Sequence, residues 1–410
     1  MKRFALLLLI GCAPGAFDRQ GQAIPGRDDL ALDTVHVHVH AGLSDEFVLR
    51  LPEGAGGALI EVRGSGGEYR LAQLVTPSGN DLVESGGFVT RDARQAPGLV
   101  DWLFPNTPTL SADPGAYRVR VTALDAGGAA IDDDLEVRLY VRSGEPTAAR
   151  LHVDFLVADG ALADADVDSV VQLLSRLFAP AGIDIADYVV QPVALPGNVT
   201  LSTSVAPALR SARSDAVHIV LVRSIDDGGG PLAGYALGLP GPFDVDRPNA
   251  AVLVATAPFA SPSTGNIDLD GLAVTCAHEM GHYLGLYHTS ERDGSLHDPI
   301  SDTPECTANG SSICPDADNI MFWTGGAMRH ALSEGQASVL RRHPLSQTWV
   351  GGQPSPGPPM CDPGCTAPDI CVQWSGQPRC MMACDPNGDP CPTGYSCLPS
   401  EDHTYVCGPN

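Results

Sequence analysis

The chain has 410 residues and a formal net charge of −25 at pH 7, and its 45 glycines and 35 prolines accompany an aromatic content of only 6%. The length indicates two or three domains, and the composition favours β-rich, loop-rich domains over helical bundles. The negative charge argues against nucleic acid as a partner, because a phosphate backbone is bound by a basic surface.

The first residues have the pattern of an export signal. Lys2 and Arg3 form a positively charged start, and residues 4–10 are an apolar run. This run is shorter than the roughly 20 residues that a membrane-spanning helix requires, and no later segment is long and apolar enough to span a bilayer.

The end of this signal indicates how the chain is anchored. Residues 9–12 resemble a bacterial lipobox, so we predict a signal peptide over residues 1–12 that ends at a lipidated Cys12. An ordinary signal-peptidase site within residues 13–16 is the alternative. We expect an exported protein, either a cell-envelope lipoprotein or an extracellular one, with membrane contact only through the lipid anchor.

The next segment has the pattern of an antiparallel β-sandwich. Residues 17–30 are interpreted as a polar tether. Residues 31–142 contain short alternating runs, such as 35–39 and 47–51, separated by turn signals such as 77–80. The role of this domain stays open between a spacer, a substrate contact and a pro-segment.

Three histidines lie on the first strand of this domain. His36, His38 and His40 alternate with valines, so all three imidazoles would project from one face. They could bind a metal ion. We favour instead a half-exposed strand whose valines point inward.

Residues 148–346 alternate strands and helices, which predicts an α/β domain. A strand at 151–157 precedes a helix at about 164–179, and Gly182 ends that helix after one apolar stripe. Three further strands are predicted, at residues 183–190, 217–222 and 251–255. A capping box begins a last helix at residues 333–342.

The motif H-E-x-x-H-x-x-G-x-x-H begins at His278, on a helix that starts near residue 270. His278 and His282 are four residues apart and therefore project from one helix face. Gly285 allows a sharp turn that ends the helix and returns His288 as a third ligand. Three protein ligands leave one position open, which is the catalytic form of a zinc site, and the carboxylate of Glu279 can reach a water in that position.

This motif, together with Met321 within residues 319–323, resembles the metzincin zinc metallopeptidases, which have a methionine turn beneath the metal. The segment D-x-x-x-D-T-P at residues 298–304 resembles the pappalysin family in particular, named for pregnancy-associated plasma protein-A. The resemblance covers about residues 150–345 and implies a metzincin-like catalytic domain.

The resemblance also implies roles for individual residues. One catalytic zinc would be held by three imidazoles, those of His278, His282 and His288. Glu279 would take the proton of the attacking water and pass it to the leaving amine. Met321 would form a packed floor beneath the metal and would not be a ligand.

A structural calcium ion near the acidic segment is a further implication. Asp298 and Asp302 would supply carboxylate oxygens and Thr303 a hydroxyl or carbonyl oxygen. The alternative is an acidic loop that is stabilised by helix caps and by a disulfide between Cys306 and Cys314.

The chain departs from the family pattern in two places. Trp323 stands where family members usually carry a tyrosine that hydrogen-bonds the tetrahedral intermediate, so Trp323 is a candidate donor with a different reach. Residues 324–327 contain no acidic residue, so a preference for basic substrates is not transferred to this chain.

Twelve cysteines are consistent with an oxidising compartment. Cys306 and Cys314 are a candidate disulfide, and Cys276 is interpreted as a small buried helix residue. A proline- and glycine-rich linker at 351–360 leads to a disulfide-rich module at 361–410, in which C-x-x-C pairs that would indicate structural zinc are absent. The eight cysteines of this module are Cys361, Cys365, Cys371, Cys380, Cys384, Cys391, Cys397 and Cys407.

The sequence therefore predicts a multidomain, exported zinc metalloendopeptidase that hydrolyses protein or peptide substrates. The alternative from another class is a cell-surface binding or adhesion protein with a vestigial zinc site. The intact Glu279 argues against it, because loss of that base is the usual mark of such decay. A zinc enzyme with a downstream glutamate as third ligand is disfavoured by His288 at its fixed offset.

Overall fold

A computed structural model describes most of the chain from residue 22 to residue 348. The described ranges are 22–90, 96–306, 314–324 and 329–348, followed by 369–374, 377–382, 391, 395–399 and 405–409. The predicted signal peptide with Cys12, the linker at 351–360 and most of the cysteine-rich module lie outside these residues. Within the described part, no helix is long and apolar enough to cross a membrane.

The N-terminal strands form one antiparallel, nine-stranded sheet in the order β4-β8-β3-β2-β9-β5-β7, in which β1 pairs with β2 and β6 with β8. The strands curl around a core of their alternating inward residues, as the sequence pattern predicts. Their bounds are β1 (Gln22–Ile24), β2 (Arg27–His40), β3 (Leu43–Ser44), β4 (Phe47–Leu51), β5 (Ala55–Arg63), β6 (Glu68–Val75), β7 (Leu99–Phe104), β8 (Gly115–Leu124) and β9 (Asp133–Ser143).

The predicted tether at residues 17–30 is wrong in its described part. β1 and the start of β2 form a hairpin there, with Gly26 at φ +79° in the turn. Arg27 and Leu30 are buried, and Arg27 donates a 2.9 Å hydrogen bond to Asp29. The polar composition hid this strand, because its charged residues pair with each other and with neighbours.

A second sheet has the order β11-β10-β13-β17-β16, and β18 also pairs with β10. Neighbours from β11 to β17 are parallel, whereas β16 is antiparallel to β17 and ends the order. The bounds are β10 (Ala149–Ala158), β11 (Ile183–Val193), β13 (Ala216–Val222), β16 (Gly234–Ala236), β17 (Val252–Ala255) and β18 (Gln347–Thr348). The strands predicted in this region are present, and the short β16 was missed.

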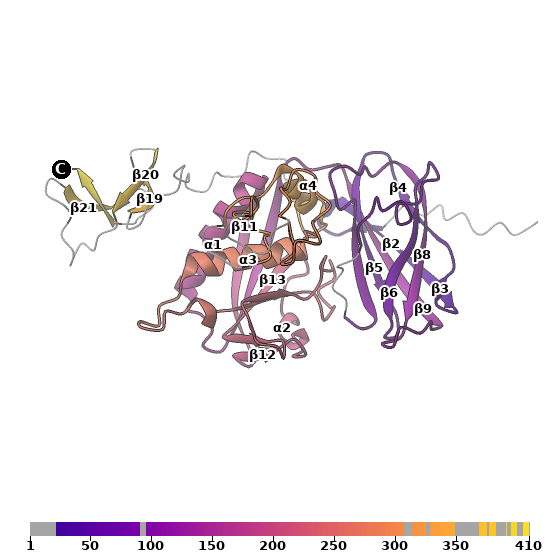
Figure 1. Cartoon of the computed structure of the whole chain (residues 1–410), viewed down its shortest axis with the longest axis horizontal. Coiled ribbons are helices and arrows are strands. Elements are labelled where there is room, and N and C mark those ends of the chain that lie inside the picture. The colour runs from indigo at the N-terminus through magenta and orange to yellow at the C-terminus, as the bar shows by residue number, and fades with distance from the viewer. Residues whose placement is uncertain are drawn as a thin grey trace, which may run out of the picture.

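The helices α1 (Asp164–Phe178) and α3 (Leu269–Tyr283) lie side by side against this sheet (Figure 1). The buried residues of α1 are those of the predicted apolar stripe, and Gly182 takes φ +70° after it. The helix α4 (Glu334–Arg342) begins with the predicted capping box at Ser333. These helices pack against parallel strands, so this part of the chain combines helices with a mostly parallel sheet.

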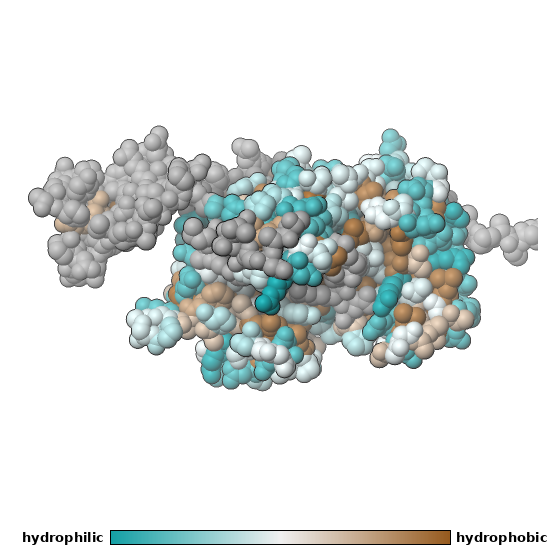
Figure 2. Space-filling view, viewed as in Figure 1, coloured by the Kyte–Doolittle hydropathy of each residue, from teal (hydrophilic) through white to brown (hydrophobic). Residues whose placement is uncertain are grey.

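Smaller elements complete the described chain. They are β12 (Asn198–Thr200), β14 (Ser224–Asp226) and β15 (Pro231–Leu232), which form a three-stranded sheet, the helix α2 (Ala206–Leu209), and the 3-10 turns η1 (Ala179–Ala181) and η2 (Ala257–Phe259). The C-terminal hairpins are β19 (Asp369–Trp374) with β20 (Gln377–Met382) and β21 (Tyr395–Pro399) with β22 (Tyr405–Pro409). A disulfide joins Cys391 to Cys407. Figure 2 shows hydrophilic residues over much of the visible described surface, with apolar groups scattered among them.

Candidate metal centre

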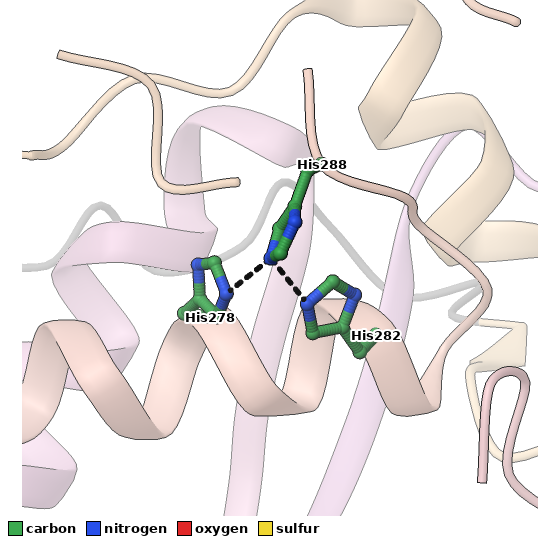
Figure 3. Close-up of side chains that lie close together, drawn as sticks. All are labelled: His278, His282 and His288. Carbon is green, nitrogen blue, oxygen red and sulfur yellow. Dashed lines mark hydrogen bonds between the residues drawn. The ribbon is translucent and has the colours of Figure 1, made fainter. Parts of the chain in front are cut away.

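The helix α3 positions the first two histidines of the motif. The Asp268 side chain caps the helix by accepting a 3.1 Å hydrogen bond from the Gly271 amide. Nearly all residues of α3 are buried, so packing fixes the orientation of the helix. His278 and His282 project from the same face toward His288, which returns from the following segment (Figure 3).

Gly285 makes that return possible. Its φ of +105° is disfavoured for a side chain with a Cβ. The amide of Gly285 donates to the His282 carbonyl and the amide of Leu286 donates to Gly281, each at 2.9 Å. These bonds close the helix end and turn the chain back within a few residues.

The three imidazoles converge on one point through their Nε2 atoms. The Nε2 of His288 lies 3.1 Å from that of His282 and 3.3 Å from that of His278. Two nitrogens bound at ~2.05 Å to a tetrahedral zinc lie about 3.3 Å apart. The spacing therefore fits a tetrahedral ion with three histidine ligands.

Each imidazole is also anchored through its other nitrogen. The Nδ1 of His278 donates to the Ile320 carbonyl at 2.7 Å, and that of His282 to the Leu286 carbonyl at 2.8 Å. The Nδ1 of His288 pairs with Glu291 Oε1 at 2.9 Å. With Nδ1 as the donor, each Nε2 carries the lone pair that a metal ligand needs.

Glu279 is a residue of α3 whose side chain lies against Gly234 of β16, the strand that ends the second sheet. Its side chain is 6% exposed. A Cβ built on Gly234 of β16 would lie 2.8 Å from Glu279 Oε1, so the carboxylate occupies the space that a side chain at residue 234 would fill. This places the candidate base against the edge strand.

Met321 packs beneath the motif. It is fully buried, and a Cβ on Gly281 would lie only 2.3 Å from its sulfur. Asn319 accepts a 2.8 Å hydrogen bond from the Met321 amide and exchanges two hydrogen bonds with Gln336 of α4. Asn319 and Gln336 thus hold this turn, and sequence reasoning assigned neither of them that role.

Trp323 lies beside two other side chains. Its ring centroid is 5.8 Å from that of Phe322, and the Arg292 guanidinium is 5.7 Å from the Trp323 ring. These contacts do not place the indole N–H against the three imidazoles. Its part as a donor in the reaction stays a prediction.

The acidic segment folds into a compact turn in which Ile300 and Thr303 are buried and Asp302 is exposed. Asp298 Oδ1 accepts from Thr303 Oγ1 at 2.6 Å and from the Ile300 amide at 3.1 Å. Asp302 accepts a 2.9 Å hydrogen bond from the Gly335 amide at the start of α4. The structure therefore brings Asp298, Asp302 and Thr303 to one place.

Two buried carboxylate oxygens in this region have no hydrogen-bond partner among the described residues: Asp298 Oδ2 and Asp316 Oδ1. Burial, with a smaller contribution from the charges of Asp302 and Asp316, raises the pKa of Asp298 to about 7 against the opposing hydrogen bonds from Thr303 and Ile300. Buried, unpaired oxygens of this kind fit a hard cation such as calcium. Asp316 was not recognised from the sequence, because it lies beyond the D-x-x-x-D-T-P segment.

Cysteines in the described part of this region are either paired or buried. Cys306 and Cys314 form a disulfide, so their sulfurs are not thiolate ligands even though Asp316 lies close to them. Cys276 is buried, and burial raises the pKa of its thiol. This is the setting of an inert packing residue.

The three histidines of β2 are exposed on one strand face, while Val37 and Val39 between them are buried. They line a surface concavity of about 1010 Å³, in which His38 pairs with Asp134. In the described ranges, ligand atoms converge in the motif histidines and in the cluster around Cys306, not here. The interpretation as a surface strand with inward valines is therefore favoured over a metal site.

Comparisons with known proteins relate the chain to metalloproteases. No protein-family model matches it. It is 27% identical over 160 residues to an extracellular metalloprotease of Pyricularia oryzae. The matched stretch covers 37% of this chain and 52% of that protein. It is 38% identical over 77 residues to an extracellular metalloprotease of Podospora anserina. This shorter match covers 18% of this chain and 24% of that protein. The chain thus spans about half, or less, of the length of these relatives.

Two solved structures are also similar in part. Mature mirolysin of Tannerella forsythia, solved with a cleaved peptide, matches with a TM-score of 0.35 and 18% identity over 48% of this chain and 96% of that chain. Metalloproteinase-II of Bacteroides fragilis matches with a TM-score of 0.30 and 15% identity over 53% of this chain and 64% of that chain. Both likenesses are weak, so the sequence similarity carries the relation to metalloproteases.

Proposed function

We propose that the chain is an exported, zinc-dependent metalloendopeptidase of the metzincin type, with a pappalysin-like acidic segment. The observation that carries this proposal is the convergence of three Nε2 atoms whose imidazoles are anchored through Nδ1. The similarity to extracellular metalloproteases supports the same class. Export with lipidation of Cys12 is part of the proposal.

The residues of the site divide the chemistry between them. His278, His282 and His288 would hold the zinc ion, which when bound supplies Lewis acidity to a water molecule and to the scissile carbonyl. Glu279 accepts the proton of the attacking water and delivers it to the leaving amine. Met321 shapes the floor beneath the histidines, and Trp323 is proposed as a donor to the developing oxyanion.

The edge of the sheet offers a way to align a substrate. β16 ends the strand order and lies directly against Glu279 through Gly234. An extended peptide that pairs with the outer edge of β16 has its backbone beside the candidate base. Such pairing recognises main-chain groups and therefore suits protein and peptide substrates of varied sequence.

Chelation provides the direct test of zinc dependence. The purified chain should cleave casein or a mixed peptide library, 1,10-phenanthroline should abolish the cleavage, and one equivalent of zinc should restore it, because the proposed mechanism needs the Lewis acid. A chain that binds zinc but cleaves no protein or peptide in the presence of calcium would be a binding protein instead.

We also propose a structural calcium ion at the acidic turn, held by Asp298, Asp302 and Thr303, with Asp316 nearby. The support is the pair of buried carboxylate oxygens that no described hydrogen-bond donor reaches. A bound cation would compensate the charge of the Asp298 carboxylate, whose pKa is raised mainly by burial and less by the charges of Asp302 and Asp316.

Calcium should therefore raise the melting temperature of the wild-type chain, and the substitution Asp298→Asn should remove most of that increase. A shift of a few degrees is expected for a ligand at about 100 times its Kd. Asp293→Asn is the matched control, because Asp293 is exposed on the same segment and bonds only Ser295 among its described partners. Equal calcium responses in the two variants would exclude this site.

A further inference from the structure

We propose that the N-terminal β-sheet domain of residues 31–142, named the sandwich after its predicted fold, is a permanent part of the metal centre and not a removable pro-segment. It holds the turn that carries His288, with Leu103 as the positioning residue. This inference rests on the proposed zinc site, but it concerns a domain to which that function assigns no role.

Leu103 of β7 belongs to the core of the other domain. It is 2% exposed and lies in the buried cluster built around α1, α3 and the parallel sheet, together with Leu59 and Tyr140 of the sandwich. A Cβ on Gly285 would lie 2.8 Å from Leu103 Cδ2. Leu103 thus fills the space beside Gly285, which lies between His282 and His288 in the sequence.

Hydrogen bonds connect the sandwich to the segment around this turn. The Tyr287 hydroxyl, one residue before His288, donates to the Val89 carbonyl at 3.2 Å. Thr107 Oγ1 donates to the Pro299 carbonyl at 3.0 Å, next to the acidic turn. The sandwich therefore contacts both sides of the segment that carries His288.

A buried charge network connects the sandwich to a loop of the α/β part. Arg247 is 3% exposed and pairs with Asp101 of β7 at 2.8 Å and with Glu61 of β5 at 3.4 Å. Asp101 also accepts a 3.0 Å hydrogen bond from Asn249, and Glu61 accepts a 2.7 Å one from the Phe243 amide. These charges are satisfied only while the two parts stay together.

The same loop is fastened to the end of the zinc helix. The Gly241 amide donates to the Tyr283 carbonyl at 2.7 Å, and the Tyr283 hydroxyl donates to the Pro242 carbonyl at 2.8 Å. A Cβ on Gly241 would lie 2.2 Å from the Tyr283 ring, so the loop and the helix end are in close contact. The sandwich thereby fixes the helix end after His282.

Removal of the sandwich would expose the apolar surface that Leu59 and Leu103 cover and would leave Arg247 without the carboxylates of Asp101 and Glu61. A common apolar core and paired buried charges are typical of parts that stay associated, because separation exposes the apolar residues and unpairs the charges. If residues 31–142 were a pro-segment, the remaining catalytic part would have to be stable after their removal. The contacts around residues 283–288 are therefore interpreted as support for the metal centre.

Leu103→Ala is the first test, with Leu49→Ala as the matched control. Leu49 is fully buried, but it lies in the sandwich's own core. Leu103→Ala should weaken zinc binding, measured by competition with a chromophoric chelator, by about tenfold or more. Leu49→Ala should lower the melting temperature and leave zinc affinity within about twofold, and Leu103→Met, of similar volume, should restore most of the affinity. Equal zinc affinities in all three variants would overturn the positioning role.

A nicked chain gives the second test, and its readout of association does not depend on zinc. A specific protease site is inserted after Gly144, which is exposed at the boundary of the two parts. The cut halves should elute together in size-exclusion chromatography, with zinc content and peptide cleavage unchanged. Halves that separate, or activity that rises after the cut, would show that the sandwich is a pro-segment. Failure of the wild type to bind zinc would refute the proposed function, while co-elution would still report on the assembly.

Discussion

Glu279→Ala should reduce kcat for peptide cleavage by about 10²–10⁴-fold, because the variant has no group to take the proton of the attacking water. Zinc content should stay near one ion per chain, since the proposed ligands are the three imidazoles and the Glu279 carboxylate lies beside the edge strand. Cleavage of a fluorogenic peptide and metal analysis on the same sample measure the two effects together.

Two control variants sharpen this result. Glu279→Gln keeps the size of the side chain but cannot accept the proton, so it should be as impaired as Glu279→Ala. Glu53→Gln removes an exposed carboxylate of the sandwich and should leave activity unchanged. If Glu279→Gln retained most of the activity, another residue would be the base.

Gly285→Ala should weaken zinc binding by about 10–100-fold, in the range found when the support of a metal ligand is removed. The substitution places a Cβ at φ +105° and 2.8 Å from Leu103, so the turn must shift and His288 moves with it. Competition with a chelator measures the affinity, and a thermal melt measures the stability.

Gly54→Ala is the matched control for backbone strain. Gly54 also has a positive φ, +75°, but a Cβ there would meet nothing within 4 Å. Both substitutions carry the left-handed penalty of about 1–2 kcal/mol. Only Gly285→Ala should change zinc affinity. An unchanged affinity in that variant would mean that the turn does not position the third ligand.

The sequence was most informative where local pattern alone decides structure. The apolar stripe of α1, the capping box of α4 and the spacing of the zinc motif are each set within a few residues, and the structure shows all three. The alternation at the end of β2 likewise predicted that Val37 and Val39 are buried between exposed histidines.

The residues that sequence reasoning missed depend on contacts between distant segments. Glu291 beside His288, Asn319 with Gln336, and Leu103 against Gly285 have no motif of their own. The short strand β16 has too few residues to show a period, although it packs on the candidate base. The hairpin of β1 and β2 was not predicted, because its polar residues resemble those of a tether. In the structure Arg27 pairs with Asp29.

The zinc K-edge X-ray absorption spectrum of the purified chain tests the central claim most directly. The account predicts one zinc ion per chain with three imidazole nitrogens at about 2.0–2.1 Å, a light oxygen ligand and no sulfur. A sulfur shell near ~2.3 Å, a fourth imidazole that closes the site, or a chain that retains no zinc would contradict it.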